Sequence, residues 1–211
     1  VSFDWPVIQQ WKQRVVDRLA NGVRRLIAGN RIELVKGTAW FLNAEEMRIE
    51  GEETAHRFKF EHCILATGAH AISLPNLPYD GQQILPPEHA LQLSELPEAL
   101  SIYGNDYIAL ELATLFARLG VLVKLYVPGE QIIAGIDAAA LRLVQAGMRK
   151  LGIQIVTRRD IASIYERPLL VSNGVKANTD TLHLDEAGIQ VTERGGIAVN
   201  TMQQSSVPHI Y

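Results

Sequence analysis

Apolar residues recur at every third or fourth position near the start of the chain, and this spacing predicts one amphipathic helix between Asp4 and Asn30. Pro6 falls in the first turn, where a missing N–H costs little, and Gly29 with Asn30 is a typical stop. The apolar positions of this face are Ile8, Trp11, Val15, Leu19, Val23, Leu26 and Ile27.

From Arg31 to Ala66 the apolar residues alternate with polar ones, which is the period of a half-buried strand. Residues 32–41, 46–51 and 56–68 therefore predict three strands joined by short polar turns, a small β-meander. Residues 72–98 hold most of the chain's prolines. Because proline fixes φ and has no N–H to donate, this stretch predicts an irregular crossing connection.

A repeated strand–helix order follows the connection. Short apolar strands are predicted at 100–103, 121–127, 153–157 and 169–172. Between them lie a helix with its apolar face at Ile108, Leu112, Leu115, Phe116 and Leu119, and a second helix from the N-cap Asp137 to Leu151 with Gly152 behind it. This order with short loops predicts an α/β fold with a right-handed, parallel, doubly wound sheet.

Composition and charge narrow the class of function. The 211 residues are 47% hydrophobic and 20% charged, and the net charge is −3, so we expect a soluble protein without a nucleic-acid or membrane partner. The first helix does carry basic residues, but Asp17 interrupts them and no aromatic platform accompanies them, so we interpret them as a solvated face. They are Lys12, Arg14, Arg18, Arg24 and Arg25.

The single cysteine, Cys63, excludes an intrachain disulfide and suits a reducing, cytoplasmic compartment. It falls in an alternating stretch, so we interpret it as a small buried hydrophobe rather than a catalytic group. His62, His70 and His183 lack the spacing of metal ligands. We therefore expect neither a metal site nor catalytic residues in this chain.

Residues 101–120, SIYGNDYIALELATLFARLG, have the layout of a dinucleotide-binding unit: strand, tight turn, helix. The three fingerprint positions are Gly104, Asp106 and Ala109. A glycine at the second position normally lets the backbone approach the pyrophosphate. An aspartate there adds a side chain and a negative charge, and two like charges about 4 Å apart repel by roughly 1 to 4 kcal/mol.

The same carboxylate suits the helix, since it can accept from free N–H groups and face the positive end of the helix dipole. The protein's own anion would then occupy the phosphate site. About twenty residues past such a turn, an acidic residue normally binds the ribose hydroxyls. Val127 stands at that position. The turn thus favours a scaffold whose nucleotide binding is lost or weakened, with a working NAD site as the alternative.

Eight stretches, in this order, resemble the flavoprotein disulfide reductases, and within that family the dihydrolipoamide dehydrogenase group. They are WKQRVVDRLANGVRRLIAGNRIELVKGTAWF, ILATGAH, ISLPNLPYDGQQIL, YGNDYIALELATLFARLG, GEQIIAGID, NGVKANTD, LDEAGIQVTERGGIAVN and SSVPHIY. The resemblance implies the cofactors FAD and NAD. It also implies a Rossmann-like NAD(P)-binding domain at 86–175 and a partial flavin-type lobe formed by 1–85 and 176–211.

The resemblance assigns further positions. Ala39, Thr67 and Gly68 resemble contacts to the adenine half of the flavin, although Gly68 could equally end a strand. Glu111 matches a glutamate that pairs with a lysine beside the flavin, and a solvated helix carboxylate is an equal alternative. Gly174 resembles a glycine near the nicotinamide, but the arginine and proline usual after it are absent here.

Relative to the family pattern, the chain begins after the redox-active cysteine pair and stops before the segment with the catalytic histidine. The resemblance therefore implies part of an oxidoreductase that is not catalytic alone. Its partners would be the missing parts of its own fold or a second subunit, and neither cofactor should bind tightly. The alternative is a degenerate, non-catalytic paralogue kept for structure or assembly.

Overall fold

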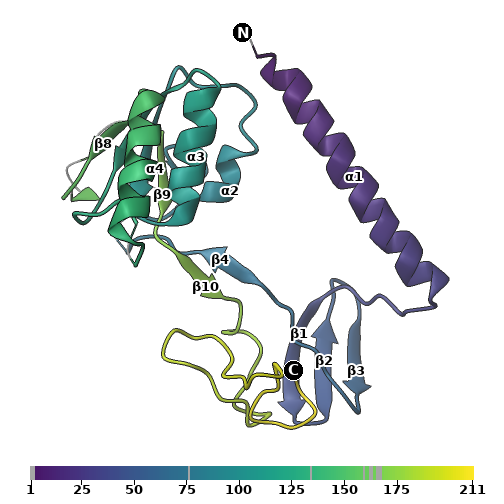
Figure 1. The fold of residues 1–211 in the computed structure, drawn as a ribbon. Coiled ribbons are helices and arrows are strands. Elements are labelled where there is room, and N and C mark those ends of the chain that lie inside the picture. The colour runs from purple at the N-terminus through teal and green to yellow at the C-terminus, as the bar shows by residue number, and fades with distance from the viewer. Residues whose placement is uncertain (1–2, 76, 134, 159, 162–163, 165–167) are drawn as a thin grey trace. The chain divides into compact units, whose positions relative to one another are not determined.

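The computed structural model describes residues 3–75, 77–133, 135–158, 160–161, 164 and 168–211 (Figure 1). The chain divides into two compact units, Val1–Asp17 with Ala71–Gly174 and Arg18–His70 with Val175–Tyr211. The long helix α1 (Trp5–Gly29) begins in the first unit and ends in the second. A two-stranded sheet pairs β4 (Ala69–Ala71) with β10 (Val175–Ala177).

The first unit is built on a five-stranded parallel sheet in the order β5-β9-β6-β7-β8. The strands are β5 (Ile84–Leu85), β6 (Ala99–Gly104), β7 (Leu122–Tyr126), β8 (Gln154–Val156) and β9 (Leu169–Ser172). The helices are α2 (Pro87–Ala90), α3 (Tyr107–Arg118) and α4 (Ala138–Lys150). The predicted α/β class with a parallel sheet is confirmed.

Helices α3 and α4 pack on one face of this sheet (Figure 1). Ile102 and Leu125, which are register partners across β6 and β7, lie in this core with Phe116 of α3. The opposite face is covered in part by the proline-rich connection. Its residues Leu74, Leu77 and Tyr79 pack against Tyr103, Tyr126, Leu169 and Val171.

Local signals set the helix ends as predicted. Asp137 caps α4, and its carboxylate accepts from the N–H groups of Ala139 and Ala140 at 2.8 and 3.2 Å. Gly152 follows α4 with φ of +78°, a conformation that glycine adopts without a steric penalty.

The proline-rich connection is more regular than predicted. It contains both β5, which pairs with β9 at the edge of the sheet, and the short helix α2. Two residues of strand are too few to show a period of two, so the sequence pattern does not reveal β5. Pro87 falls in the first turn of α2, where a missing N–H is tolerated.

The second unit contains the predicted antiparallel meander, β1 (Thr38–Asn43), β2 (Glu46–Glu50) and β3 (Ala55–Lys59). Two strand bounds were wrong. The first strand begins at Thr38 instead of residue 32, and the third ends at Lys59, before Cys63. Cys63 instead forms an isolated parallel bridge with Ile210, beside a small core of Phe41, Leu182, Leu184, Ala187, Ile189 and Ile210.

Helix α1 forms where the spacing predicts it, yet its apolar face is not buried. Trp11, Leu19 and Leu26 are 60%, 66% and 66% exposed, and Trp5 alone among the described residues of the helix is buried. Trp5 donates from its indole N–H to the carbonyl of Leu93 at 2.8 Å. The amphipathic pattern therefore forecast the helix correctly, while the described parts of the chain leave most of its apolar stripe in solvent.

Within the described residues, none of the helices has both the length and the apolar character needed to cross a membrane.

Candidate functional site: the turn between β6 and α3

The turn at Asp106 lies where β6 ends and α3 begins. Asp106 is the N-cap of α3, with extended backbone (φ −115°, ψ 172°), and its Oδ1 accepts from the N–H of Ala109 at 2.8 Å. The first N–H groups of a helix lack partners within the helix, and a carboxylate there also faces the positive end of the dipole. The predicted capping role of Asp106 is confirmed.

The carboxylate also binds the end of the neighbouring strand β9. The hydroxyl of Ser172 lies 2.8 Å from both carboxylate oxygens of Asp106, and the N–H of Gly174 donates to Oδ2 at 3.2 Å. Ser172 was not among the site residues predicted from the sequence. A serine that closes a predicted apolar strand was the available signal, but nothing in the sequence shows that β9 lies beside β6.

These contacts lie at the position where α/β sheets bind ligands. The chain runs from β6 outward to β7 and β8, whereas β9 and β5 lie on the other side of β6. Such a reversal of strand order opens a crevice at the carboxyl ends of the strands. Asp106 and Ser172 are at the carboxyl ends of β6 and β9, so the Asp106 carboxylate binds three donors where a ligand crevice is expected in this fold.

Gly104 permits the close approach of the two strands. A Cβ on Gly104 would lie 2.4 Å from the carbonyl oxygen of Ser172 and 3.0 Å from the Cβ of Ala109. Ala109 is completely buried. The first and third fingerprint positions thus keep the packing geometry that the fingerprint requires, and the second carries the substitution.

Val127 follows β7 and is fully buried in the core beneath α3 and α4. Its N–H donates to the carbonyl of Val156 at 2.8 Å. A glutamate at position 127 would place its carboxylate in this core, and burying an unpaired charge costs free energy of folding. Val127→Glu is therefore not expected to strengthen nucleotide binding, although Val127 stands at the position of the usual acidic residue.

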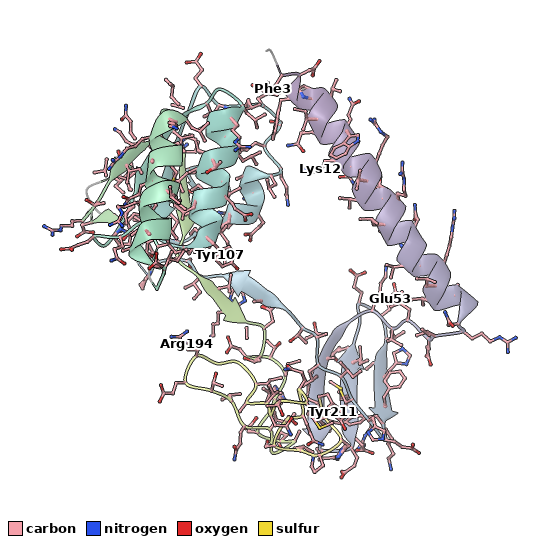
Figure 2. The ribbon with its side chains drawn as sticks, viewed as in Figure 1. Phe3, Lys12, Glu53, Tyr107, Arg194 and Tyr211 are labelled. Carbon is pink, nitrogen blue, oxygen red and sulfur yellow. The ribbon has the colours of Figure 1, made fainter. Side chains whose placement is uncertain are left out.

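Glu111 lies on the exposed side of α3, one turn beyond Tyr107, which Figure 2 labels at the start of this helix. It borders an apolar groove of about 700 Å³ whose lining includes Leu115, Ile136 and Val144. The sequence left two interpretations of Glu111, a carboxylate that pairs with a lysine beside the flavin and a solvated helix residue, and its exposure does not decide between them. Its role stays a prediction.

The positions proposed for the adenine half of a flavin lie in the second unit. Thr67 and Gly68 are joined to Asn178, a residue that the sequence analysis did not single out. The Thr67 hydroxyl donates to the Asn178 carbonyl at 3.0 Å, and the Asn178 N–H donates to the Gly68 carbonyl at 3.0 Å. Gly68 has φ of +71°, which supports its role as a turn. Ala39 lies in β1, opposite Ile49.

Gly174 has φ of +84°, and in this conformation its N–H reaches Asp106. Lys176, which stands near the usual arginine position, forms an ion pair with Asp180 at 2.6 Å. The structure thus joins Gly104, Asp106, Ala109 and Gly174 in one crevice. Ala39, Thr67 and Gly68 belong to the other unit.

Tyr79 reinforces the end of β9. Its hydroxyl lies 2.9 Å from the carbonyl of Ile72 and 3.0 Å from that of Val171, the residue before Ser172. Burial raises the pKa of Tyr79 to about 12, and the negative charges of Glu88 and Asp106 add to this shift.

This shift predicts a dependence of stability on pH. A folded pKa above the ordinary value of 10 favours the protonated tyrosine, so its contribution is complete below pH 10 and is lost as pH rises toward 12. Tyr79→Phe should cost about 1 to 2 kcal/mol at pH 7. The difference from the wild type should shrink between pH 10 and 12. Urea unfolding at several pH values measures it, with the exposed Tyr107→Phe as the control at pH 7. A constant difference would contradict the prediction.

Cys63 is half-buried next to the core of the second unit, and burial raises the pKa of its thiol. A raised pKa leaves less thiolate, which is the reactive form. Among the side chains that the structure describes, no three from His, Cys, Asp and Glu are grouped to hold a metal ion.

Comparison with known proteins places this geometry in a family. The family model described as pyridine nucleotide-disulphide oxidoreductase matches residues 2–168. A dihydrolipoyl dehydrogenase from Geobacillus stearothermophilus is 32% identical over 231 residues, covering 100% of this chain and 49% of that protein. Another, from Bacillus subtilis (strain 168), is 35% identical over 229 residues, with 100% and 50% covered.

Solved structures agree on the fold. The Cu(II) complex of the HOCl-induced flavoprotein disulfide reductase RclA from Escherichia coli has a TM-score of 0.90 at 25% identity, covering 99% of this chain and 51% of that chain. LpdA from Mycobacterium tuberculosis also has a TM-score of 0.90, at 18% identity, covering 100% and 51%. The chain spans about half the length of the curated relatives it matches. With the fold, the fingerprint turn and the family match in agreement, this chain belongs to the pyridine nucleotide-disulphide oxidoreductase family.

Proposed function

We propose that this chain supplies a nucleotide-type domain and part of a flavin-type domain to an oxidoreductase resembling dihydrolipoamide dehydrogenase, and that its nicotinamide-nucleotide site is closed. The nucleotide-type domain would be residues 86–175, and the flavin-type lobe would be 1–85 with 176–211. One observation carries the closure: the carboxylate of Asp106 binds the donors of the crevice, namely Ala109, Ser172 and Gly174.

The crevice does not fit the pyrophosphate of NAD. A phosphate would need N–H groups at the start of α3, and Asp106 already binds the N–H of Ala109 there. A phosphate beside this carboxylate would meet a repulsion of roughly 1 to 4 kcal/mol. Val127 adds no acidic partner for a ribose, because it is an apolar, buried residue. We therefore derive no hydride-transfer step for this chain.

For FAD, the residues of the second unit that resemble family contacts are Ala39, Thr67 and Gly68. The flavin would supply the redox chemistry of the family, and these residues would contact only its adenine half. This chain spans about half the length of the curated relatives it matches. The oxidoreductase activity is therefore proposed for an assembly in which this chain is joined to the remaining family segments or to a second subunit, in the cytoplasm.

This proposal predicts that the isolated chain retains no flavin. After refolding or expression with excess FAD, gel filtration should yield a colourless protein without the absorption bands of oxidised flavin. A yellow protein peak with a stoichiometric flavin would contradict the prediction.

A second candidate is a non-catalytic paralogue that has lost cofactor binding altogether. The Asp106 contacts favour it as well, since they stabilise the fold without any ligand. Equilibrium dialysis against NADH tests the closed site that both candidates share, with Asp106→Gly as the comparison variant. We expect no saturable binding by this chain in the micromolar range. Reconstitution with the family segments that this sequence lacks then separates the two, because only the first candidate should gain flavin.

A further inference from the structure

The carboxylate of Asp106 is held from two directions. The N–H of Ala109 belongs to the first turn of α3, whereas the Ser172 hydroxyl and the Gly174 N–H belong to the end of β9 and the residues after it. A helix cap alone needs only the first of these contacts. The contacts from β9 connect two segments separated by more than sixty residues in the sequence.

Ser172 is built for this contact. Its residue is only 2% exposed, and its hydroxyl oxygen is equally distant, at 2.8 Å, from both oxygens of Asp106. A hydroxyl has one proton to donate, so it can bind either oxygen without the carboxylate turning away. Hydrogen bonds to an ionised acceptor are stronger than those between neutral groups.

The surrounding backbone keeps Ser172 in place. Gly104 leaves no room for a side chain between β6 and the carbonyl of Ser172, and register pairing sets Gly104 directly opposite Ser172. Tyr79 binds the carbonyl of the preceding residue, Val171. The hydroxyl of Ser172 is therefore fixed beside the start of α3, and without it the Asp106 carboxylate would keep only the N–H groups of Ala109 and Gly174 as its partners among the described residues.

We propose that Ser172 is the positioning residue that holds the Asp106 carboxylate across the crevice and thereby determines that the crevice excludes phosphate-bearing ligands. This inference rests on the proposed closure of the nucleotide site. The Asp106 carboxylate supplies the negative charge that repels a phosphate, and the Ser172 hydroxyl helps to hold that carboxylate in its observed conformation. The two residues together act as an autoinhibitory contact.

A double-mutant cycle between Ser172→Ala and Asp106→Gly tests the pair by thermal unfolding. We expect Ser172→Ala to lower Tm by about 3 to 8 °C in the wild type and by less than about 2 °C in Asp106→Gly, where the hydroxyl has lost its partner. Ser101 is another buried serine of the same sheet. Ser101→Ala should lower Tm by the same amount in the wild type and in Asp106→Gly. An equal cost of Ser172→Ala in both backgrounds would overturn the inference.

NADH affinity is a second measurement, and a purely structural role of Ser172 would not change it. Ser172→Ala should raise the affinity of the intact chain for NADH by about tenfold, because one charge-assisted hydrogen bond to Asp106 is lost. Ser172→Thr, which keeps the hydroxyl, should leave the affinity for NADH as low as in the wild type. If Asp106→Gly gains affinity and Ser172→Ala does not, the inference fails and the closed site stands. If neither variant gains affinity, the proposed closure itself is wrong.

Discussion

Asp106→Gly should convert a crevice that excludes nucleotides into one that binds NADH about five- to a thousandfold more tightly than the wild type. The substitution removes a side chain from the phosphate position and a repulsion of roughly 1 to 4 kcal/mol. It also frees the N–H groups of Ala109 and Gly174, which the carboxylate now occupies. Fluorescence titration with NADH measures the change.

Asp106→Asn is the matched control, because it removes the charge and keeps the size of the side chain. If repulsion is the main effect, Asn should recover much of the gain. If the side chain blocks the site mainly by volume, Asn should stay close to the wild type. The gain should be paired with a stability loss of about 1 to 3 kcal/mol in Asp106→Gly, since the contacts from α3 and β9 disappear.

Gly104→Ala should destabilise the first unit by about 3 kcal/mol, which lowers Tm by roughly 6 to 12 °C. The new Cβ would stand 2.4 Å from a backbone carbonyl oxygen, a contact that cannot be relieved by turning a side chain. Strands β6 and β9 would have to separate at the point where Asp106 and Ser172 meet.

Gly147→Ala in α4 provides the opposite control. Apart from its chain neighbours and the backbone of its own helix, no atom of the described residues lies within 4 Å of a Cβ at that position. Alanine in a helix interior is favoured over glycine by about 0.5 to 1 kcal/mol. Circular dichroism melting of both variants should show a loss for the first and a small gain for the second. A Gly104→Ala variant as stable as the wild type would show that the strands do not approach closely there.

Patterns of period and turn chemistry predicted most of the first unit, because each of its long elements carries its own local signal. The helix caps at Asp106 and Asp137 and the apolar run of β7 are determined by a few neighbouring residues. Strand β5 escaped prediction since its two residues carry no period, and it forms only because β9 offers a partner.

Only those features of the site that depend on neighbouring residues could be predicted from the sequence. The exchange of glycine for aspartate at Asp106 shows in the sequence, and so does its capping role. Ser172 and Asn178 could not be found in the same way, because their partners lie 66 and 111 positions away and depend on strand order. The burial of Val127 likewise follows from the packing of α3 and α4 and not from a count of residues.

The most direct test of the closed crevice is a calorimetric titration of NADH into the wild type and Asp106→Gly in the same low-salt buffer. Low salt is chosen because screening would otherwise weaken the repulsion under test. We predict no saturable heat for the wild type at micromolar concentrations and a measurable isotherm for Asp106→Gly. Micromolar binding by the wild type that stays unchanged in Asp106→Gly would contradict the account.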